Sequence, residues 1–146
     1  MRVSLVYFLK IKNRDSYNLV INLQGDLPFL KTSHLRSLVS IFKNKDYQMA
    51  SLASKIIDSE KIKDKNVVKI AMTKCNSNVY RAVYFSRLPI PYGSKDYYEH
   101  VGIYGYKPKM LKSFMAMKSS KLEFSEKLEQ LRALENLVDI YIGIVK

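Results

Sequence analysis

The sequence predicts an α/β fold in which helices flank a mixed β-sheet. Short apolar runs rich in β-branched residues alternate with segments of helical period, which is the pattern of a layered α/β protein. Two of the runs are separated by the turn-forming residues 76–78 (NSN), which predicts a hairpin and therefore a sheet that is not purely parallel. The chain has 146 residues, 47% of them apolar, so we expect a single domain, residues 1–146, with a core of its own.

Six apolar runs are predicted to form the strands. Their residue ranges are 18–23, 47–53, 67–72, 79–85, 101–106 and 138–145. Because side chains alternate across a strand, His100, Tyr104 and Tyr106 are expected to share one face. The segment 88–98 contains two prolines and Gly93, which predicts an irregular loop.

Three segments of helical period are predicted to form helices, at residues 32–42, 107–117 and 122–136. Thr32 or Ser33 is expected to cap the first helix. Pro108 fits the first turn of the second, where its missing N–H is not needed. In the third, Glu129 and Arg132 have the i, i+3 spacing of an ion pair.

The net charge of +12 has two interpretations. A basic surface attracts nucleic acid, so a basic nucleic-acid-binding module is one alternative for the function. However, the excess consists mainly of scattered lysines, and Lys, Asn and Ile are all residues of A/T-rich codons. The densest stretch, residues 61–69, also lacks the aromatic side chains of a single-strand binding groove. We therefore expect no nucleic-acid partner.

The sequence contains no apolar stretch of the roughly 20 residues that a transmembrane helix requires, so no membrane partner is expected. A short apolar run near the amino terminus is interrupted by Lys10 and Lys12, unlike a secretory signal. The lone Cys75 has no partner for an intramolecular disulfide. Together these features predict a cytoplasmic protein.

Two loops after predicted strands carry groups that suit phosphates or carboxylates. Asp26 follows Gly25 just beyond a strand, where open α/β sheets bind ligands, and a carboxylate there suits Mg²⁺. An ordinary Gly-Asp turn is the alternative. Arg87 at another strand end has the geometry to clamp a carboxylate or phosphate, although a solvated arginine is equally ordinary.

Two further segments carry uncharged and acidic polar groups. His100 and Tyr104 share a strand face with small glycines between them, which leaves room for a polar ligand. The alternative is a sheet face that is simply lined by aromatic side chains. Glu129 and Gln130 are adjacent on the predicted third helix, so they cannot both lie on its buried stripe; a solvated helix face is the alternative for them.

Taken in order, several segments resemble the 3-deoxy-manno-octulosonate (Kdo) cytidylyltransferases of Gram-negative bacteria. The matching segments are 20–26 (VINLQGD), 49–53 (MASLA), 66–70 (NVVKI), 84–87 (YFSR) with 90–91 (IP), 100–106 (HVGIYGY) and 128–132 (LEQLR). The resemblance implies a Rossmann-like nucleotide-diphospho-sugar transferase fold. It also implies a reaction in which Kdo and CTP give CMP-Kdo and pyrophosphate for lipopolysaccharide synthesis, with Mg²⁺ as cofactor.

The resemblance assigns a role to each candidate residue. Asp26 corresponds to a metal ligand and is the candidate catalytic residue, and Gln24 lines the sugar site. Arg87 is expected near the Kdo carboxylate. The groups expected to hold Kdo hydroxyls are His100, Tyr104, Glu129 and Gln130. The partners implied are CTP, Kdo and a second copy of the chain in a homodimer.

The chain also departs from the family pattern. Residues 1–17 do not match the family's opening loop, which grips the triphosphate, and the carboxyl-terminal metal segment is not matched either. Leu27 and Phe124 replace an acidic residue and a histidine that are usual in the family. We therefore expect an incomplete, truncated domain that is inactive alone. A non-functional remnant of a broken gene is the alternative.

Overall fold

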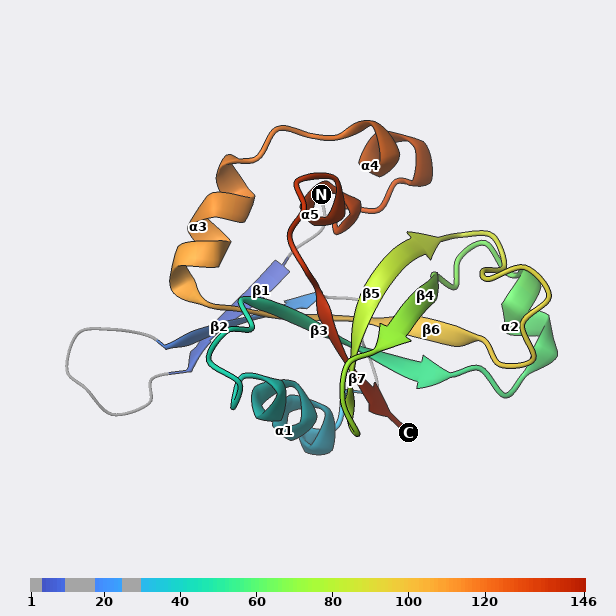
Figure 1. Ribbon diagram of the computed structural model, residues 1–146, viewed down its shortest axis with the longest axis horizontal. Helices are drawn as coiled ribbons and strands as arrows, with labels where there is room; N and C mark the ends of the chain where they lie inside the picture. Colours follow the sequence, from blue (N-terminus) through green and yellow to red (C-terminus); the bar gives the residue numbers. More distant parts are fainter. Residues whose placement is uncertain (1–3, 10–17, 25–29) are drawn as a thin grey trace.

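A computed structural model describes residues 4–9, 18–24 and 30–146, with backbone only for residues 4–9 and for Gln24. The strands are β1 (Ser4–Leu9), β2 (Leu19–Gln24), β3 (Met49–Lys55), β4 (Lys69–Lys74), β5 (Val79–Ser86), β6 (Tyr98–Tyr106) and β7 (Tyr141–Val145). The helices are α1 (Thr32–Ile41), α2 (Ser59–Lys63), α3 (Pro108–Ala116), α4 (Lys121–Glu126) and α5 (Leu131–Glu135). The strands form one sheet of order β1-β2-β6-β3-β7-β5-β4, with α1 on one face and α3, α4 and α5 on the other (Figure 1).

The sheet is mixed, as predicted. Its strands β3 and β7 run parallel, and the other described pairs are antiparallel. The predicted hairpin is formed by β4 and β5. Its turn is held by the Asn76 side chain, whose Oδ1 accepts hydrogen bonds from the backbone N–H of Asn78 at 3.1 Å and of Val79 at 3.0 Å. An asparagine that bonds to its own turn in this way stabilises the reversal locally.

Helix α1 packs closely against the sheet because two glycines lie beneath it. Leu38, Ile41 and Phe42 bury their side chains against β6 and β7. A Cβ built on Gly105 lies 2.6 Å from the Phe42 ring, and one on Gly143 lies 3.2 Å from Cδ1 of Ile41. Side chains at these two positions would push the helix away, so glycine sets the spacing between helix and sheet.

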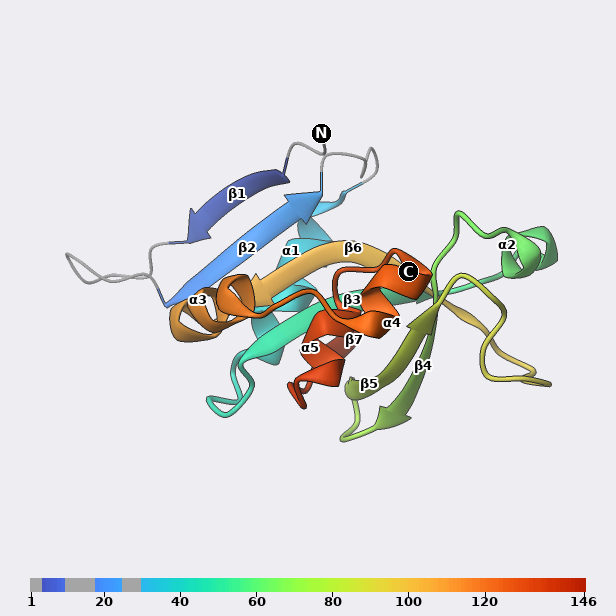
Figure 2. The ribbon, with the colours of Figure 1, turned by 90° about the horizontal axis from the view of Figure 1, so that it is seen from above.

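Helices α3, α4 and α5 cover the opposite face, on which the predicted site residues of β6 lie (Figure 2). Phe114 of α3 and Leu131 of α5 pack there against Phe85, Tyr104 and Ile142 of the sheet. None of the described helices combines the length and the apolar composition that crossing a membrane would require.

Two of the helix predictions are wrong in detail. The segment 122–136 is not one helix: α4 ends where Lys127 adopts a left-handed conformation (φ 56°), and α5 begins at Leu131. The reason is a contact between distant residues. Arg132 bonds to Glu123, nine residues earlier, and in a straight helix these residues would stand about 13 Å apart along the axis. The first helix already includes Thr32, so Lys31 occupies the cap position instead of Thr32 or Ser33.

Helix α5 ends in a Schellman motif that has leucine where glycine is favoured. The N–H of Val138 donates to the carbonyl of Ala133 at 2.9 Å, and the N–H of Leu137 donates to that of Leu134 at 3.0 Å. Leu137 has a φ of 58° and its side chain is 94% exposed. The strain of a left-handed leucine is therefore not offset by burial.

Replacing Leu137 by glycine is expected to raise the free energy of unfolding by about 0.5–1 kcal/mol, because glycine adopts the left-handed conformation without strain. Urea denaturation measures the change. Leu137→Ala is the matched control, since it removes the exposed side chain but keeps the Cβ that causes the strain. The explanation is wrong if alanine stabilises the protein as much as glycine.

Candidate functional site

A row of aromatic side chains on β6 forms the centre of the candidate site. The ring centroids of His100 and Tyr104 lie 5.3 Å apart, and those of Tyr104 and Tyr106 lie 6.0 Å apart. Both tyrosines are buried, whereas His100 keeps part of its surface exposed. The strand has a bulge between these residues, because Tyr104 pairs with Ser51 of β3 while Val101 pairs with Leu52. The three side chains still share one face, as the alternation predicts.

Burial keeps this row uncharged near neutral pH. It lowers the pKa of His100 to about 4, and it raises the pKa of Tyr104 and of Tyr106 well above the ordinary value for tyrosine. Such groups can exchange hydrogen bonds with a ligand without contributing a net charge. They are suited to hydroxyl groups more than to phosphates.

Ser51 lies beside this row, opposite Tyr104 on the neighbouring strand β3, and sequence reasoning did not identify it as a site residue. Its side chain is fully buried, and its Oγ lies 2.8 Å from Nε2 of His100. The same hydroxyl lies 2.7 Å from the carbonyl oxygen of Ile103. Only the pairing of β3 with the bulged β6 brings these groups together.

The turn between α4 and α5 places Glu129 and Gln130 near the row. Gln130 is buried, whereas the Glu129 side chain is 61% exposed, so the two are separated as predicted. The carboxylate of Glu129 is close enough to contribute to the raised pKa values of Tyr104 and Tyr106. The structure thus brings four predicted residues into one region: His100, Tyr104, Glu129 and Gln130.

Arg132 holds this turn in place. Its Nε donates to Oε2 of Glu123 at 2.9 Å, and its Nη2 bonds to the other carboxylate oxygen. The guanidinium also lies 5.4 Å from the ring centre of Phe114 and 3.8 Å from the carboxylate of Glu129. The predicted pair between Glu129 and Arg132 therefore exists, but the closer partner of Arg132 is Glu123.

Arg87 lies at the end of β5 and ties three segments together. Its guanidinium donates to the carbonyls of Glu126 at 2.9 Å, Lys65 at 2.9 Å and Lys127 at 3.4 Å. The Glu126 side chain in turn accepts from the Arg87 N–H at 3.0 Å and from the Ser86 hydroxyl at 2.7 Å. Bonds to the described residues use three of the five guanidinium N–H groups, and the other two have no partner among those residues. No pattern in the sequence points to Glu126.

Lys69 of β4 is fully buried close to Arg87. Its ammonium donates to the carbonyl of Asp64 at 2.7 Å and also to that of Val67. Burial lowers the pKa of this lysine. The side chain therefore fixes the loop before β4 to the sheet.

Two predicted site residues are not located by the structure. Asp26 lies outside the described residues, and only the backbone of Gln24 is described, at the end of β2 opposite Ser4. Asn22, two residues before Gln24, pairs with Tyr104, and its enclosed Oδ1 has no hydrogen-bond partner among the described residues. Within the residues that the structure describes, no group of three or more His, Cys, Asp or Glu side chains is placed so that it could hold a metal ion.

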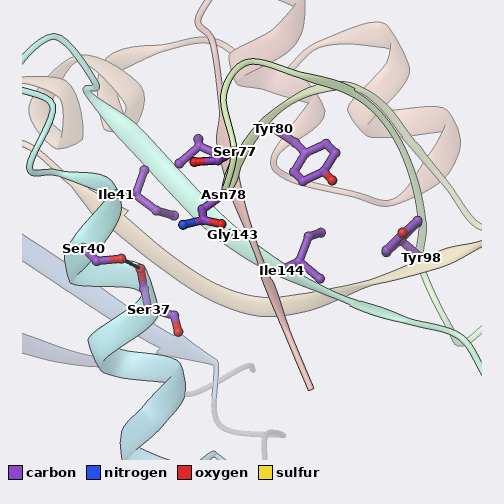
Figure 3. Close-up of a pocket in the computed structure, with 10 residues that line it drawn as sticks. Ser37, Ser40, Ile41, Ser77, Asn78, Tyr80, Tyr98, Gly143 and Ile144 are labelled. Carbon is purple, nitrogen blue, oxygen red and sulfur yellow. Dashed lines mark hydrogen bonds between the residues drawn. The ribbon is translucent and has the colours of Figure 1, made fainter.

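A cavity of about 350 Å³ lies elsewhere, beside α1 and the turn between β4 and β5 (Figure 3). Its polar lining consists of serine hydroxyls, the Asn78 amide and the side chains of Tyr80 and Tyr98, and none of the described residues that line it is charged. The Ser40 hydroxyl is already bonded to the Ser37 carbonyl at 2.7 Å. Gly143 in its wall faces α1, so this cavity lies away from the row on β6.

Comparison with known proteins identifies the family of the chain. The family model described as cytidylyltransferase matches residues 3–140. Two curated relatives are named 3-deoxy-manno-octulosonate cytidylyltransferase. The protein from Bartonella bacilliformis is 42% identical over 136 residues, 93% of this chain and 56% of the relative. The protein from Fusobacterium nucleatum is 45% identical over 125 residues, 82% of this chain and 49% of the relative.

A solved structure of CMP:2-keto-3-deoxy-manno-octonic acid synthetase, complexed with CTP, has the same fold. It aligns with a TM-score of 0.79 and 29% identity, covering 90% of this chain and 54% of that one. This chain spans about half the length of the curated relatives it matches. Because the family model matches almost the whole of it, the chain belongs to the cytidylyltransferase family.

Proposed function

We propose that this chain binds Kdo on the row of β6, as the sugar-recognising part of a Kdo cytidylyltransferase. The observation that carries the proposal is the uncharged pair His100 and Tyr104, beside which the turn bearing Glu129 and Gln130 is fixed. Kdo is a sugar acid with several hydroxyl groups. Neutral side chains that donate and accept hydrogen bonds in a partly buried site are suited to such groups.

Each residue offers Kdo a different contact. The Tyr104 hydroxyl donates and accepts, the Gln130 amide does both through different atoms, and the Glu129 carboxylate accepts. Gln24 of β2 lines the same site in this proposal. Arg87 offers its two remaining N–H groups to the carboxylate of Kdo, which would form charge-assisted hydrogen bonds.

In the proposed reaction, the anomeric hydroxyl oxygen of Kdo forms a bond to the α-phosphorus of CTP. The bond from that phosphorus to the oxygen bridging to the β-phosphate breaks, pyrophosphate leaves and the hydroxyl proton is released. A carboxylate following a strand is chemically suited to Mg²⁺, so Asp26 would hold the metal. The metal would neutralise part of the phosphate charge.

We also propose that the protein is located in the cytoplasm and that it forms a homodimer.

The contribution of Tyr104 can be tested by Kdo binding. Tyr104→Phe removes a hydroxyl from the proposed site without removing the ring from the core, so we expect about tenfold weaker Kdo binding. Calorimetric titration of the folded chain with Kdo measures the change. We choose binding and not turnover as the readout because the chain spans about half the length of its relatives, and the proposal concerns sugar recognition alone.

Tyr92→Phe is the matched control, since Tyr92 is fully exposed on the loop after β5 and loses the same atom. We expect its affinity to equal that of the wild type. The proposal fails if the wild-type chain does not bind Kdo, or if the Tyr104 and Tyr92 variants bind it equally well.

A further inference from the structure

The buried hydroxyl of Ser51 has more polar neighbours than it has protons to donate. Its Oγ has three polar neighbours: the carbonyl oxygens of Ile103 at 2.7 Å and Val101 at 3.3 Å, and Nε2 of His100 at 2.8 Å. A hydroxyl carries a single proton, and a carbonyl oxygen can only accept. Because Ser51 is fully buried, water does not supply a further proton.

Only one arrangement satisfies all the short contacts. If Ser51 donated to His100, its oxygen would face the Ile103 carbonyl oxygen at 2.7 Å with no proton between them. If Ser51 donates to Ile103 instead, its oxygen is free to accept, and Nε2 of His100 must carry the proton that it receives. A neutral imidazole has one N–H, so Nδ1 then holds a lone pair.

We infer that Ser51 is a positioning residue that holds His100 in the Nε2–H form, so that Nδ1 can only accept a hydrogen bond. The ring is also fixed by packing, since its centroid lies 5.1 Å from that of Phe85 in an edge-on arrangement. The pKa of His100 is about 4, so the ring is neutral at pH 7 and carries only one N–H. A protonated ring would instead donate from both nitrogens.

The inference gives the site a chemical selectivity. A nitrogen that only accepts pairs with a hydroxyl donor and repels the lone pairs of a phosphate or carboxylate oxygen. At this position the site therefore selects a sugar hydroxyl over an anionic oxygen. This last step rests on the proposed binding of Kdo, whereas the tautomer itself does not.

The tautomer can be read directly from nitrogen-15 NMR of the imidazole rings. The chain has only two histidines, and His34 on α1 serves as the internal reference. At pH 7 we expect the His100 Nε2 shift of a protonated nitrogen and the Nδ1 shift of an unprotonated one. A protonated Nδ1, or two averaged shifts, would overturn the inference.

Variants then test the role of Ser51. In Ser51→Ala we expect both His100 nitrogens to move toward the averaged shifts of an exchanging imidazole, while Ser51→Thr, which keeps the hydroxyl, restores the wild-type shifts. An unchanged pattern in Ser51→Ala would overturn the assigned role. If that variant does not fold, the wild-type shifts together with the threonine variant decide the question, because averaged shifts in Ser51→Thr would equally contradict it.

Addition of Kdo separates this inference from the proposed function. If the hydroxyl contact forms, the Nδ1 resonance of His100 moves upfield in the wild type as the nitrogen accepts a hydrogen bond, and His34 does not respond. If the tautomer is as inferred but Kdo causes no change at His100, the positioning role of Ser51 stands and the hydroxyl contact is wrong.

Discussion

Lowering the pH from 7 to 4 is expected to reduce the free energy of unfolding by about 3 kcal/mol through His100 alone. The folded protein holds the pKa of this histidine at about 4, whereas in the unfolded chain it returns to about 6.5. Between these values the unfolded state binds a proton that the folded state does not. Stability therefore rises with pH through this window, and it falls as the solution is acidified.

The measurement is urea denaturation at several pH values between 7 and 4. His100→Gln should remove most of the acid-induced loss, because glutamine keeps an N–H donor near Ser51 but does not titrate. His34→Gln is the control, in which His100 is unchanged and the loss persists. If the wild type and the His100 variant respond identically to pH, the folded protein does not lower the pKa of this histidine by desolvation.

The second large effect is expected from Arg132→Ala, which should lower the free energy of unfolding by about 3 kcal/mol and the melting temperature by about 10 °C. The side chains of Arg132 and Glu123 are only 15% and 14% exposed. Removing the guanidinium leaves the Glu123 carboxylate partly buried without its main partner, and it removes the contact with Phe114. The turn that carries Glu129 and Gln130 loses its anchor at the same time.

Arg81→Ala is the matched control for thermal unfolding. Arg81 pairs with Asp139 at 3.3 Å, but both side chains are 48% exposed, so its loss should cost less than about 1 kcal/mol. The pH dependence of the free energy of unfolding provides a second check. Arg132 lowers the pKa of Glu123, so the pair stabilises the fold above the ordinary glutamate pKa and loses this effect as the pH falls through the lowered value. Equal destabilisation by the two alanine variants would contradict the assignment.

The elements that were predictable from sequence are those that local interactions determine. The hairpin of β4 and β5 was predicted from its asparagines, and Asn76 indeed holds the turn through its own side chain. Helix α2 was missed although Asp58 caps it with a 3.0 Å bond to the Glu60 N–H, because five residues are too few to show a helical period. The break at Lys127 was missed because it depends on a contact between residues distant in the chain.

The residues of the candidate site also fall into those that were predictable from local sequence and those that depend on contacts with other segments. Strand alternation alone placed His100 and Tyr104 on one face. The spacing of β6 does not reveal Ser51, because its contact with His100 depends on a bulge in the pairing with another strand, 49 residues away in sequence. The resemblance to a family supplied Gln130, whose burial results from the turn between α4 and α5 and not from a helical stripe.

The buried ammonium of Lys69 makes the corner around β4 a natural reporter of local opening. Among the lysines that the structure describes, this one has no exposed surface and is held by two backbone carbonyls. An amine-acylating reagent can reach it only after the loop before β4 has separated from the sheet. The rate at which a native sample acquires the label at Lys69 therefore measures how often this corner opens while the rest of the sheet stays folded.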